Sequence, residues 1–442
     1  MNYKIGLVSL GCAKNRTDSE IMLALLADAG CEIVSDPAVA DVIIVNTCGF
    51  IDPAKQESID AILDMARYKE EGNCKKLIAT GCLAERYSSD ILSELPEVDA
   101  ILGTGDYDKI VQVIEASFRD AAKPVICGNI DRTPEGTLPR VLLTPPYTAY
   151  IKIADGCDNR CTYCAIPMIR GRFRSRPIAE IYDEAKSLAE SGVKEIILIA
   201  QDTTRYGLDI GATLAGLLDE LVKIEGIEWI RVHYFYSEAI TKELIDTMAK
   251  YDKICNYIDM PVQHADNYIL RRMARRTSRE EMEEKIAYMR EKLKNCCIRT
   301  SIIVGFPGET EEHFAVLRDF VERMRFDRMG VFAYSREEGT PAAEFPDQID
   351  DDIKQERLDE LMRLQQQISL ELNREKIGSV LDVLVEGYDS ESCLFYGRSR
   401  ADSLDVDGNV FFGTEDEVSP GDIIRVKILD ASEYDLTGMR VD

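Results

Sequence analysis

The chain has 442 residues, of which 45% are hydrophobic and 30% are charged. These proportions are typical of soluble globular proteins and exclude an intrinsically disordered chain, while the length allows two or three domains. A net charge of −27, from 53 basic and 80 acidic side chains, disfavours phosphate backbones as partners unless a local basic surface is present. No apolar run reaches the roughly 18 residues that a membrane helix needs, and the N-terminus lacks a signal-peptide layout. We therefore expect a cytoplasmic protein with no membrane partner.

Residues 1–130 predict an N-terminal parallel α/β domain, because short apolar runs alternate there with helical patterns. We expect a helix at residues 16–30 and strands at residues 4–10, 41–47 and 76–80.

A cysteine lies one or two residues after the end of each predicted strand, namely Cys12, Cys48 and Cys82. The C-terminal ends of parallel strands meet at one edge of a sheet, which is where open α/β folds bind their ligands. Three thiols at one edge could share a metal centre. The alternative is that they are ordinary buried cysteines, as we expect for the remaining ones: Cys31, Cys74, Cys127, Cys255, Cys296, Cys297 and Cys393.

Residues 131–146 are punctuated by prolines and predict a linker. Residues 147–375 resume the alternation of strands and helices, with strands expected at 149–154, 195–202, 229–236, 257–263, 299–307 and 327–335. This pattern predicts a central open (βα) partial barrel, whose ligands lie at the C-terminal ends of the strands. A long amphipathic helix at 351–378 then leads into residues 376–442, where short alternating runs and Gly, Asp and Asn turns predict a small antiparallel β-barrel.

Cys157, Cys161 and Cys164 form a C-x3-C-x2-C loop just after the strand predicted at 149–154. The odd total of 13 cysteines in a long chain argues against a disulfide scaffold and favours metal or redox chemistry. A structural zinc needs four ligands, and no second C-x-x-C pair exists to supply the fourth. A 4Fe–4S cluster usually takes four cysteines, so three would leave one iron open for chelation. Structural zinc and an inert thiol loop remain as alternatives.

A C-x3-C-x2-C loop after the first strand of a (βα) barrel resembles the radical S-adenosylmethionine enzymes. The resemblance implies that Cys157, Cys161 and Cys164 hold a 4Fe–4S cluster, whose open iron binds S-adenosylmethionine and whose electron cleaves it to a 5′-deoxyadenosyl radical. It also implies that the cofactor is contacted by strand-end polar groups and a glycine turn: Gln201, Arg231, Gly305, Phe306, Pro307 and Gly308. Without the resemblance, the first two could be surface polar groups, and the last four a plain strand–helix turn.

Three further cysteines in the N-terminal domain and a C-terminal barrel of the TRAM type make the whole chain similar to the methylthiotransferases. This similarity implies that Cys12, Cys48 and Cys82 hold a second 4Fe–4S cluster, on which a sulfur is methylated before the CH3S group is transferred to a carbon. One branch of these enzymes modifies an adenosine of tRNA, and the other modifies the β-carbon of an aspartate in a small-subunit ribosomal protein. The stretches SLGCAKNRTDSE, IAQDTTRYG, WIRVHYFY and MPVQHADNYILRRM resemble the second branch.

The charge of the C-terminal region supports the same branch. Residues 378–442 contain fifteen acidic and five basic side chains, whereas a barrel that grips tRNA should be basic. An acidic barrel suits a basic ribosomal protein as substrate, although acidity alone could also reflect a solvated surface. An electron donor is the other partner implied. Against this trend, a run of alternating arginines is expected on one side of an extended segment, where it could contact the cofactor or RNA: Arg170, Arg172, Arg174 and Arg176.

His264 is expected to line the substrate cavity, and Trp229 to belong to the core. Besides the tRNA enzyme, two hypotheses of other classes remain open. An iron–sulfur electron carrier with a protein-docking barrel would not cleave S-adenosylmethionine, and a zinc-stabilised binding module would contain zinc and no iron.

Overall fold

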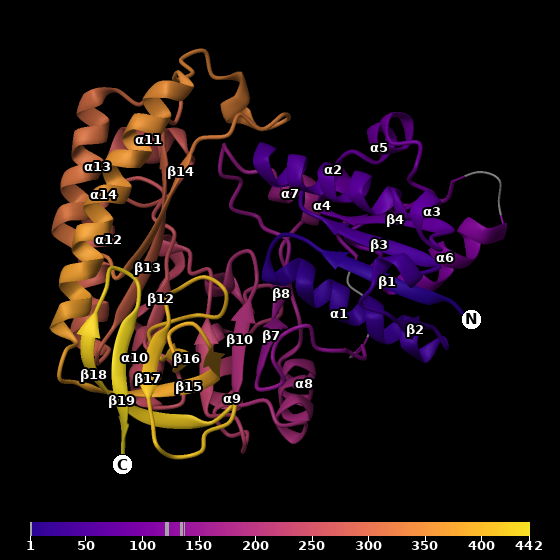
Figure 1. Cartoon of the computed structure of the whole chain (residues 1–442). Coiled ribbons are helices and arrows are strands. Elements are labelled where there is room, and N and C mark those ends of the chain that lie inside the picture. Colours follow the sequence, from indigo (N-terminus) through magenta and orange to yellow (C-terminus); the bar gives the residue numbers. More distant parts are fainter. Residues whose placement is uncertain (1, 120–122, 133–135, 137) are drawn as a thin grey trace.

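The computed structural model describes residues 2–119, 123–132, 136 and 138–442, so residues 133–135 and 137 of the predicted linker lie outside the described residues. Figure 1 shows the N-terminal domain in indigo on one side, the central domain in magenta and orange, and the C-terminal barrel in yellow beneath it. None of the described helices combines the length and apolarity needed to cross a membrane.

The N-terminal domain is built on a parallel sheet with the strand order β2-β1-β3-β4-β5-β6. Its strands are β1 (Lys4–Ser9), β2 (Glu32–Ile33), β3 (Val42–Thr47), β4 (Lys76–Gly81), β5 (Ala100–Leu102) and β6 (Val125–Ile126). Alternate residues of β3 face opposite ways. Ile44 packs with helices α1 (Ala13–Asp28) and α6 (Ile110–Arg119), whereas Ile43 packs with α2 (Asp52–Ala66). The expected parallel α/β architecture is confirmed.

The central domain forms an open partial barrel of parallel strands. Two sheets, in the orders β11-β10-β7 and β12-β13-β14, are joined by a bridge between Ile230 and Ile254. The strands are β7 (Thr148–Lys152), β10 (Glu195–Ile199), β11 (Trp229–Val232), β12 (Tyr257–Asp259), β13 (Cys297–Val304) and β14 (Arg328–Ala333).

Helices cover the outer face of this partial barrel. Ile151 of β7 and Ile196 and Leu198 of β10 belong to the large core that these helices share with the strands. The helices are α8 (Ile178–Glu190), α9 (Leu214–Leu221), α10 (Lys242–Lys250), α12 (Arg279–Lys292), α13 (Glu311–Met324) and α14 (Asp351–Glu375). Trp229 is buried, as expected.

The C-terminal region closes into a barrel in the order β15-β16-β17-β19-β18. Its strands are β15 (Val380–Asp389), β16 (Leu394–Ser399), β17 (Val410–Gly413), β18 (Ile423–Ala431) and β19 (Leu436–Val441). β15 pairs antiparallel with β16 and β18, and the pairs β16–β17 and β18–β19 are antiparallel too. β17 and β19 run parallel, a difference from the expected wholly antiparallel barrel that arises because β19 inserts between β17 and β18.

The connection between β16 and β17, which we call the lumen loop (residues 400–409), enters the central barrel. Successive side chains of β7 and β10 point alternately to the outer core and to the inside of the barrel. On the inside, Tyr150, Ile197 and Ile199 pack against Leu404. The Tyr150 hydroxyl donates to the Leu404 carbonyl at 3.3 Å. The C-terminal barrel therefore supplies part of the interior of the central domain.

Polar contacts from other strands hold the same loop. His233 Nε2 lies 2.7 Å from Ser403 Oγ, and the Tyr257 hydroxyl donates to Asp407 Oδ2 at 2.6 Å. Figure 1 shows the yellow barrel directly beneath the central strands, in agreement with these contacts.

Candidate functional site

The structure brings the N-terminal cysteines to the C-terminal edge of their sheet. Cys12 is the residue before α1, Cys48 directly follows β3, and Cys82 begins α4 (Cys82–Arg86) directly after β4. Gly11 shows how closely these strand ends meet. It has a φ of +83°, and a side-chain carbon there would lie 3.0 Å from Cys48 Cβ and 3.3 Å from Cys48 Sγ. Glycine therefore allows the Cys12 and Cys48 segments to approach each other.

Two basic side chains set the electrostatics of this N-terminal triad. Burial would raise the pKa of the Cys12 thiol, but the positive charges of Lys14 and Arg170 outweigh it and lower the pKa. Burial raises the pKa of Cys82 to about 11, with Arg170 opposing that rise. Cys12 nevertheless keeps an exposed side chain. The Cys12 thiol is therefore accessible to a bound group.

The second triad lies in the loop after β7 and β8 (Ala154–Asp155). The Cys157 amide donates to the Gly171 carbonyl at 3.1 Å, and the Cys164 amide to the Cys161 carbonyl at 3.1 Å. Burial raises the pKa of Cys157 to about 11, and burial together with the neighbouring Cys161 raises the pKa of Cys164. Arg160 adopts a φ of +53° between the first two cysteines, a conformation uncommon outside glycine and found where a loop is tightly constrained.

The two triads meet through α7 (Ile166–Arg170), which begins two residues after Cys164. Cys82 packs against Ala165 and Ile169 in one small buried cluster. A cysteine of the N-terminal triad thus packs against the residue that follows the last cysteine of the central triad. The sequence predicts each triad separately, and this contact brings Cys82 next to the segment that carries the second triad.

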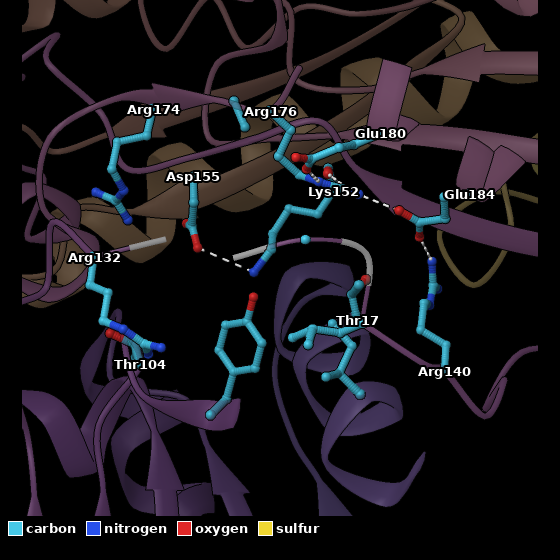
Figure 2. Close-up of a pocket in the computed structure, with 15 residues that line it drawn as sticks. Thr17, Thr104, Arg132, Arg140, Lys152, Asp155, Arg174, Arg176, Glu180 and Glu184 are labelled. Atoms are coloured by element: carbon cyan, nitrogen blue, oxygen red, sulfur yellow. Dashed lines mark hydrogen bonds and ion pairs between the residues drawn. The ribbon is translucent and has the colours of Figure 1, made fainter. Parts of the chain in front are cut away.

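A buried ion network connects the two domains beside these cysteines. Lys152 Nζ donates to Asp18 Oδ1 at 2.5 Å and to Asp155 Oδ2 at 3.2 Å. Arg170 Nη1 donates to the other Asp18 oxygen at 2.7 Å and to Asp155 Oδ2 at 3.3 Å. Although burial would raise the pKa of Asp155, Lys152 and Arg170 hold it well below its usual range. Figure 2 shows Lys152 reaching Asp155 above the helix that carries Thr17.

Arg170 also reaches the N-terminal triad directly. Its Nη2 donates to Asn15 Oδ1 at 2.5 Å and lies 3.8 Å from Cys82 Sγ. The arginine run is therefore not on one side of an extended segment, as the alternation had suggested. Arg170 ends a helix and is buried, whereas Arg172 is exposed and only Arg174 begins a strand, β9 (Arg174–Ser175).

A small cavity adjoins the ion network, between α1 and the start of the central domain. Its volume is about 50 Å³, which is room for a few water molecules and not for a substrate. Arg140 closes one side by pairing with Glu20 and Glu184, and Arg176 donates to the same Glu184 at 2.7 Å (Figure 2). This seam of charges fixes the N-terminal domain against the central one.

Of the residues predicted to contact the cofactor, Gln201 lies at this centre. It follows β10, and its Nε2 donates to Asp155 Oδ1 at 2.8 Å. Its Oε1 is buried and accepts no hydrogen bond from the described residues. A buried amide oxygen without a donor costs free energy, so Gln201 offers an acceptor to a bound molecule.

Arg231 lies elsewhere. Its side chain is fully buried, with Nε donating to Glu195 Oε1 at 3.0 Å and Nη1 donating to the Arg400 carbonyl of the lumen loop at 2.9 Å. Arg398 shares the same glutamate, from Nη2 to Oε2 at 2.7 Å. The structure thus places Arg231 in the contact between the central strands and the C-terminal barrel, not with Gln201.

The turn from Gly305 to Gly308 is held by Glu309, whose Oε2 accepts the amides of Gly305 at 3.0 Å and Phe306 at 3.3 Å. Phe306 and Pro307 are buried within it. A side-chain carbon at Gly305 would lie 2.2 Å from Lys354 Cγ, so α14 itself requires this glycine.

His264 lies behind this turn and is fully buried. Its Nε2 is 3.4 Å from Glu309 Oε2, and its Nδ1 accepts the amide of Asp266 at 2.9 Å. These contacts give His264 a part in supporting the turn.

Lys14 was not predicted from the sequence as a site residue. It lies in the first turn of α1 and is 7% exposed, with Nζ 3.4 Å from the Ala200 carbonyl oxygen and 3.4 Å from the centre of the Tyr234 ring. The available signal was the first half of α1, where Lys14, Asn15 and Asp18 are polar yet buried. A polar run at the start of an otherwise apolar helix indicates a polar partner across an interface.

The chemistry of the two triads fits iron–sulfur clusters, because each supplies thiols from one enclosed region. Within the described part of the chain, no three Cys, His, Asp or Glu side chains converge as the ligands of a single metal ion would. A cubane cluster binds each thiolate to a different iron, so its ligands stand wider apart than those of a mononuclear site.

Comparisons with known families cover most of the chain. Residues 4–103 match the uncharacterized protein family UPF0004, residues 151–321 the radical SAM superfamily and residues 377–441 the TRAM domain. The chain is 51% identical over 437 residues to the ribosomal protein uS12 methylthiotransferase RimO of Clostridioides difficile, with 98% of each chain covered. It is 52% identical over 437 residues to the protein of the same name from Desulforamulus reducens, again with 98% of each chain covered.

Solved structures share the fold at much lower sequence identity. The radical S-adenosylmethionine methyltransferase TsrM from Kitasatospora setae, with cobalamin and a [4Fe-4S] cluster bound, has a TM-score of 0.59 at 14% identity over 86% of this chain and 81% of its own. The cobalamin-dependent S-adenosylmethionine radical enzyme OxsB has a TM-score of 0.53 at 12% identity, over 82% of this chain and 56% of its own.

Proposed function

Because this chain belongs to the family of ribosomal protein uS12 methylthiotransferases, we propose that it adds a methylthio group to the β-carbon of an aspartate in uS12. It is a radical S-adenosylmethionine enzyme that uses 4Fe–4S clusters and S-adenosylmethionine. The observation that supports the proposal is the contact between the two cysteine-bearing segments, in which Cys82 packs on Ala165, the residue directly after Cys164.

We assign one cluster to each triad: the first to Cys157, Cys161 and Cys164, and the second to Cys12, Cys48 and Cys82. When bound, the clusters supply the electron that cleaves S-adenosylmethionine and the iron that holds the sulfur to be transferred. The chain's own contribution is to fix the distance between them. The buried pairs of Arg170 and Lys152 with Asp18 and Asp155 tie the two cysteine-bearing segments together.

Gln201 is the side chain that we assign to the cofactor. Asp155 holds its amide nitrogen, which leaves Oε1 as the oxygen free to accept a hydrogen bond from a bound molecule. The backbone of residues 305–308 borders the same end of the strands and is assigned to the adenosine side of S-adenosylmethionine.

The electron donor and the ribosome are proposed as the other partners, and the reaction is placed in the cytoplasm. The acidic C-terminal barrel supports a basic protein as substrate, since fifteen acidic and five basic side chains lie between residues 378 and 442. The same charge disfavours tRNA, because phosphates would be repelled.

The test is anaerobic incubation of reconstituted protein with S-adenosylmethionine, a reductant and either uS12 or total tRNA, followed by mass spectrometry of both. We expect a methylthio group on one aspartate of uS12 and none on tRNA. A methylthio group found only on an adenosine would contradict the proposed substrate.

A further inference from the structure

Lys14 occupies an unusual position for an ammonium group. Its side chain is buried between the end of β10 and the residue Tyr234, and its polar contacts are a 3.4 Å hydrogen bond to the Ala200 carbonyl and the face of the Tyr234 ring. No carboxylate of the described residues forms an ion pair with it. A buried charge is costly unless an opposite charge or several hydrogen bonds compensate it.

The neighbouring cations differ from Lys14 in this respect. Lys152 and Arg170 share the carboxylates of Asp18 and Asp155, so their charges are neutralised within the protein. Lys14 is one helical turn from Asp18 on the same helix and takes no part in that network. Among the described residues Lys14 therefore has no carboxylate partner, and its charge acts on the nearby Cys12 thiol, whose pKa it lowers.

The backbone of Tyr234, whose ring lies under the Lys14 ammonium, is strained. Tyr234 has a φ of +60°, and its amide donates to Asp259 Oδ2 at 3.1 Å. A left-handed conformation in a tyrosine is unfavourable and persists only where its surroundings enforce it, as they do at functional sites. The ring that results lies directly under the Lys14 ammonium.

The location of Lys14 matches the place where a substrate carboxylate must lie. Ala200 directly follows β10 and precedes Gln201, while Cys12 lies two residues before Lys14. A carbon that receives sulfur from the N-terminal triad must lie between that triad and the strand ends of the central domain. In an aspartate, the carboxylate is bonded directly to that β-carbon.

We propose that the Lys14 ammonium binds the side-chain carboxylate of the substrate aspartate and so orients its β-carbon toward the two triads. This inference rests on the proposed function and adds the residue that selects aspartate. The Tyr234 ring below and the Ala200 carbonyl beside the ammonium fix its direction, and the substrate supplies the carboxylate that the protein does not.

The test compares the affinity of the holoenzyme for uS12 with its affinity for a uS12 variant carrying asparagine at the target position. The wild-type protein should bind the aspartate form about tenfold or more tightly, the effect of one charge-assisted hydrogen bond. Lys14→Gln should bind both forms equally, whereas Lys186→Gln, at an exposed position, should keep the preference. Cleavage of S-adenosylmethionine and the electron paramagnetic resonance spectra of both clusters are recorded for the two variants alike, and Lys186→Gln should match the wild-type protein in both.

Three results would overturn the inference. The first is equal binding of both uS12 forms by the wild-type protein, which would overturn the inference without any variant. The second is a preference for the aspartate form that survives in Lys14→Gln. A variant with an altered N-terminal cluster spectrum and an intact preference would show that Lys14 serves the cluster instead. Failure of the proposed function is distinct, because the wild-type protein would then leave uS12 unmodified in the mass spectrum.

Discussion

Arg170 and Asp18 are 152 positions apart in the chain and form a buried pair, with Arg170 Nη1 2.7 Å from Asp18 Oδ2. One residue belongs to the helix that follows Cys12, and the other to the helix that follows Cys164. The pair therefore connects the two segments that carry the triads. Both side chains are almost fully buried, so its loss should affect folding as well as chemistry.

Replacing Arg170 with Met should lower the free energy of unfolding by about 3 kcal/mol, because it leaves the Asp18 and Asp155 carboxylates buried with Lys152 as their remaining cation. Chemical denaturation measures the change. Arg172→Met, in the same segment but exposed, is the control and should change stability by no more than about 0.5 kcal/mol. Equal losses in both variants would contradict a structural role for the pair.

The two triads should be separable by mutation. Cys157→Ala should lose about half of the bound iron and all cleavage of S-adenosylmethionine, because the first cluster loses a ligand. Cys48→Ala should lose a similar share of iron, keep cleavage to 5′-deoxyadenosine and fail to transfer sulfur. Iron analysis and chromatography of the products check both, with the exposed Cys393→Ser as control. Sulfur transfer by Cys48→Ala would remove the case for a second cluster.

Gln201 and Arg231 should respond differently to substitution. Gln201→Leu removes the buried acceptor and should weaken S-adenosylmethionine binding about tenfold, with a modest effect on stability. Arg231→Met should leave that affinity nearly unchanged and destabilise the protein by about 3 kcal/mol, because Glu195 loses one of two buried partners. Calorimetry of cofactor binding and thermal unfolding distinguish them. A large loss of affinity in Arg231→Met would restore the cofactor contact first expected for it.

His233 should make stability depend on pH. Burial lowers its pKa from 6.5 to about 4, with nearby Arg231 and Arg299 acting in the same direction and Asp259 opposing them. Because the folded protein disfavours the protonated form, the full contribution is present above pH 6.5 and is lost as the pH falls toward 4. The loss should approach about 3 kcal/mol.

Unfolding free energies measured at several pH values in wild type and His233→Gln test this dependence. The difference between the two proteins isolates the histidine from the carboxylates that titrate over the lower part of the same range. Parallel curves for the two proteins would argue against a neutral buried His233.

The sequence was sufficient to predict the strands β1, β3 and β4 and the cysteines at their ends, because strand periodicity and spacing are local properties, whereas the short strands β2, β5 and β6 were not predicted. Cys12, Cys48 and Cys82 each follow a strand, and parallel strands must end at one edge. The contact between Cys82 and Ala165 could not be predicted in this way, since it depends on how the N-terminal and central domains pack together. Lys14 was missed for the same reason, as its significance lies in the carboxylate it lacks.

For Arg231, the sequence predicted the strand but not the direction of the side chain. A strand position was inferred correctly for it, but the direction of its side chain depends on Glu195 and on Arg400 of a distant barrel. The parallel pairing of β17 with β19 is similar, because alternating sequence patterns specify strands and do not specify which neighbours they take.

The lumen loop has a consequence for protein engineering. Leu404 and Ser403 lie among the inward-facing residues of the central strands. The C-terminal barrel therefore cannot be removed without exposing part of the interior of the central domain. Chimeras that exchange this barrel between relatives should fail unless Tyr150, His233 and Tyr257 are exchanged with it. A shortened chain ending after α14 would leave the catalytic domain with an open, hydrated interior.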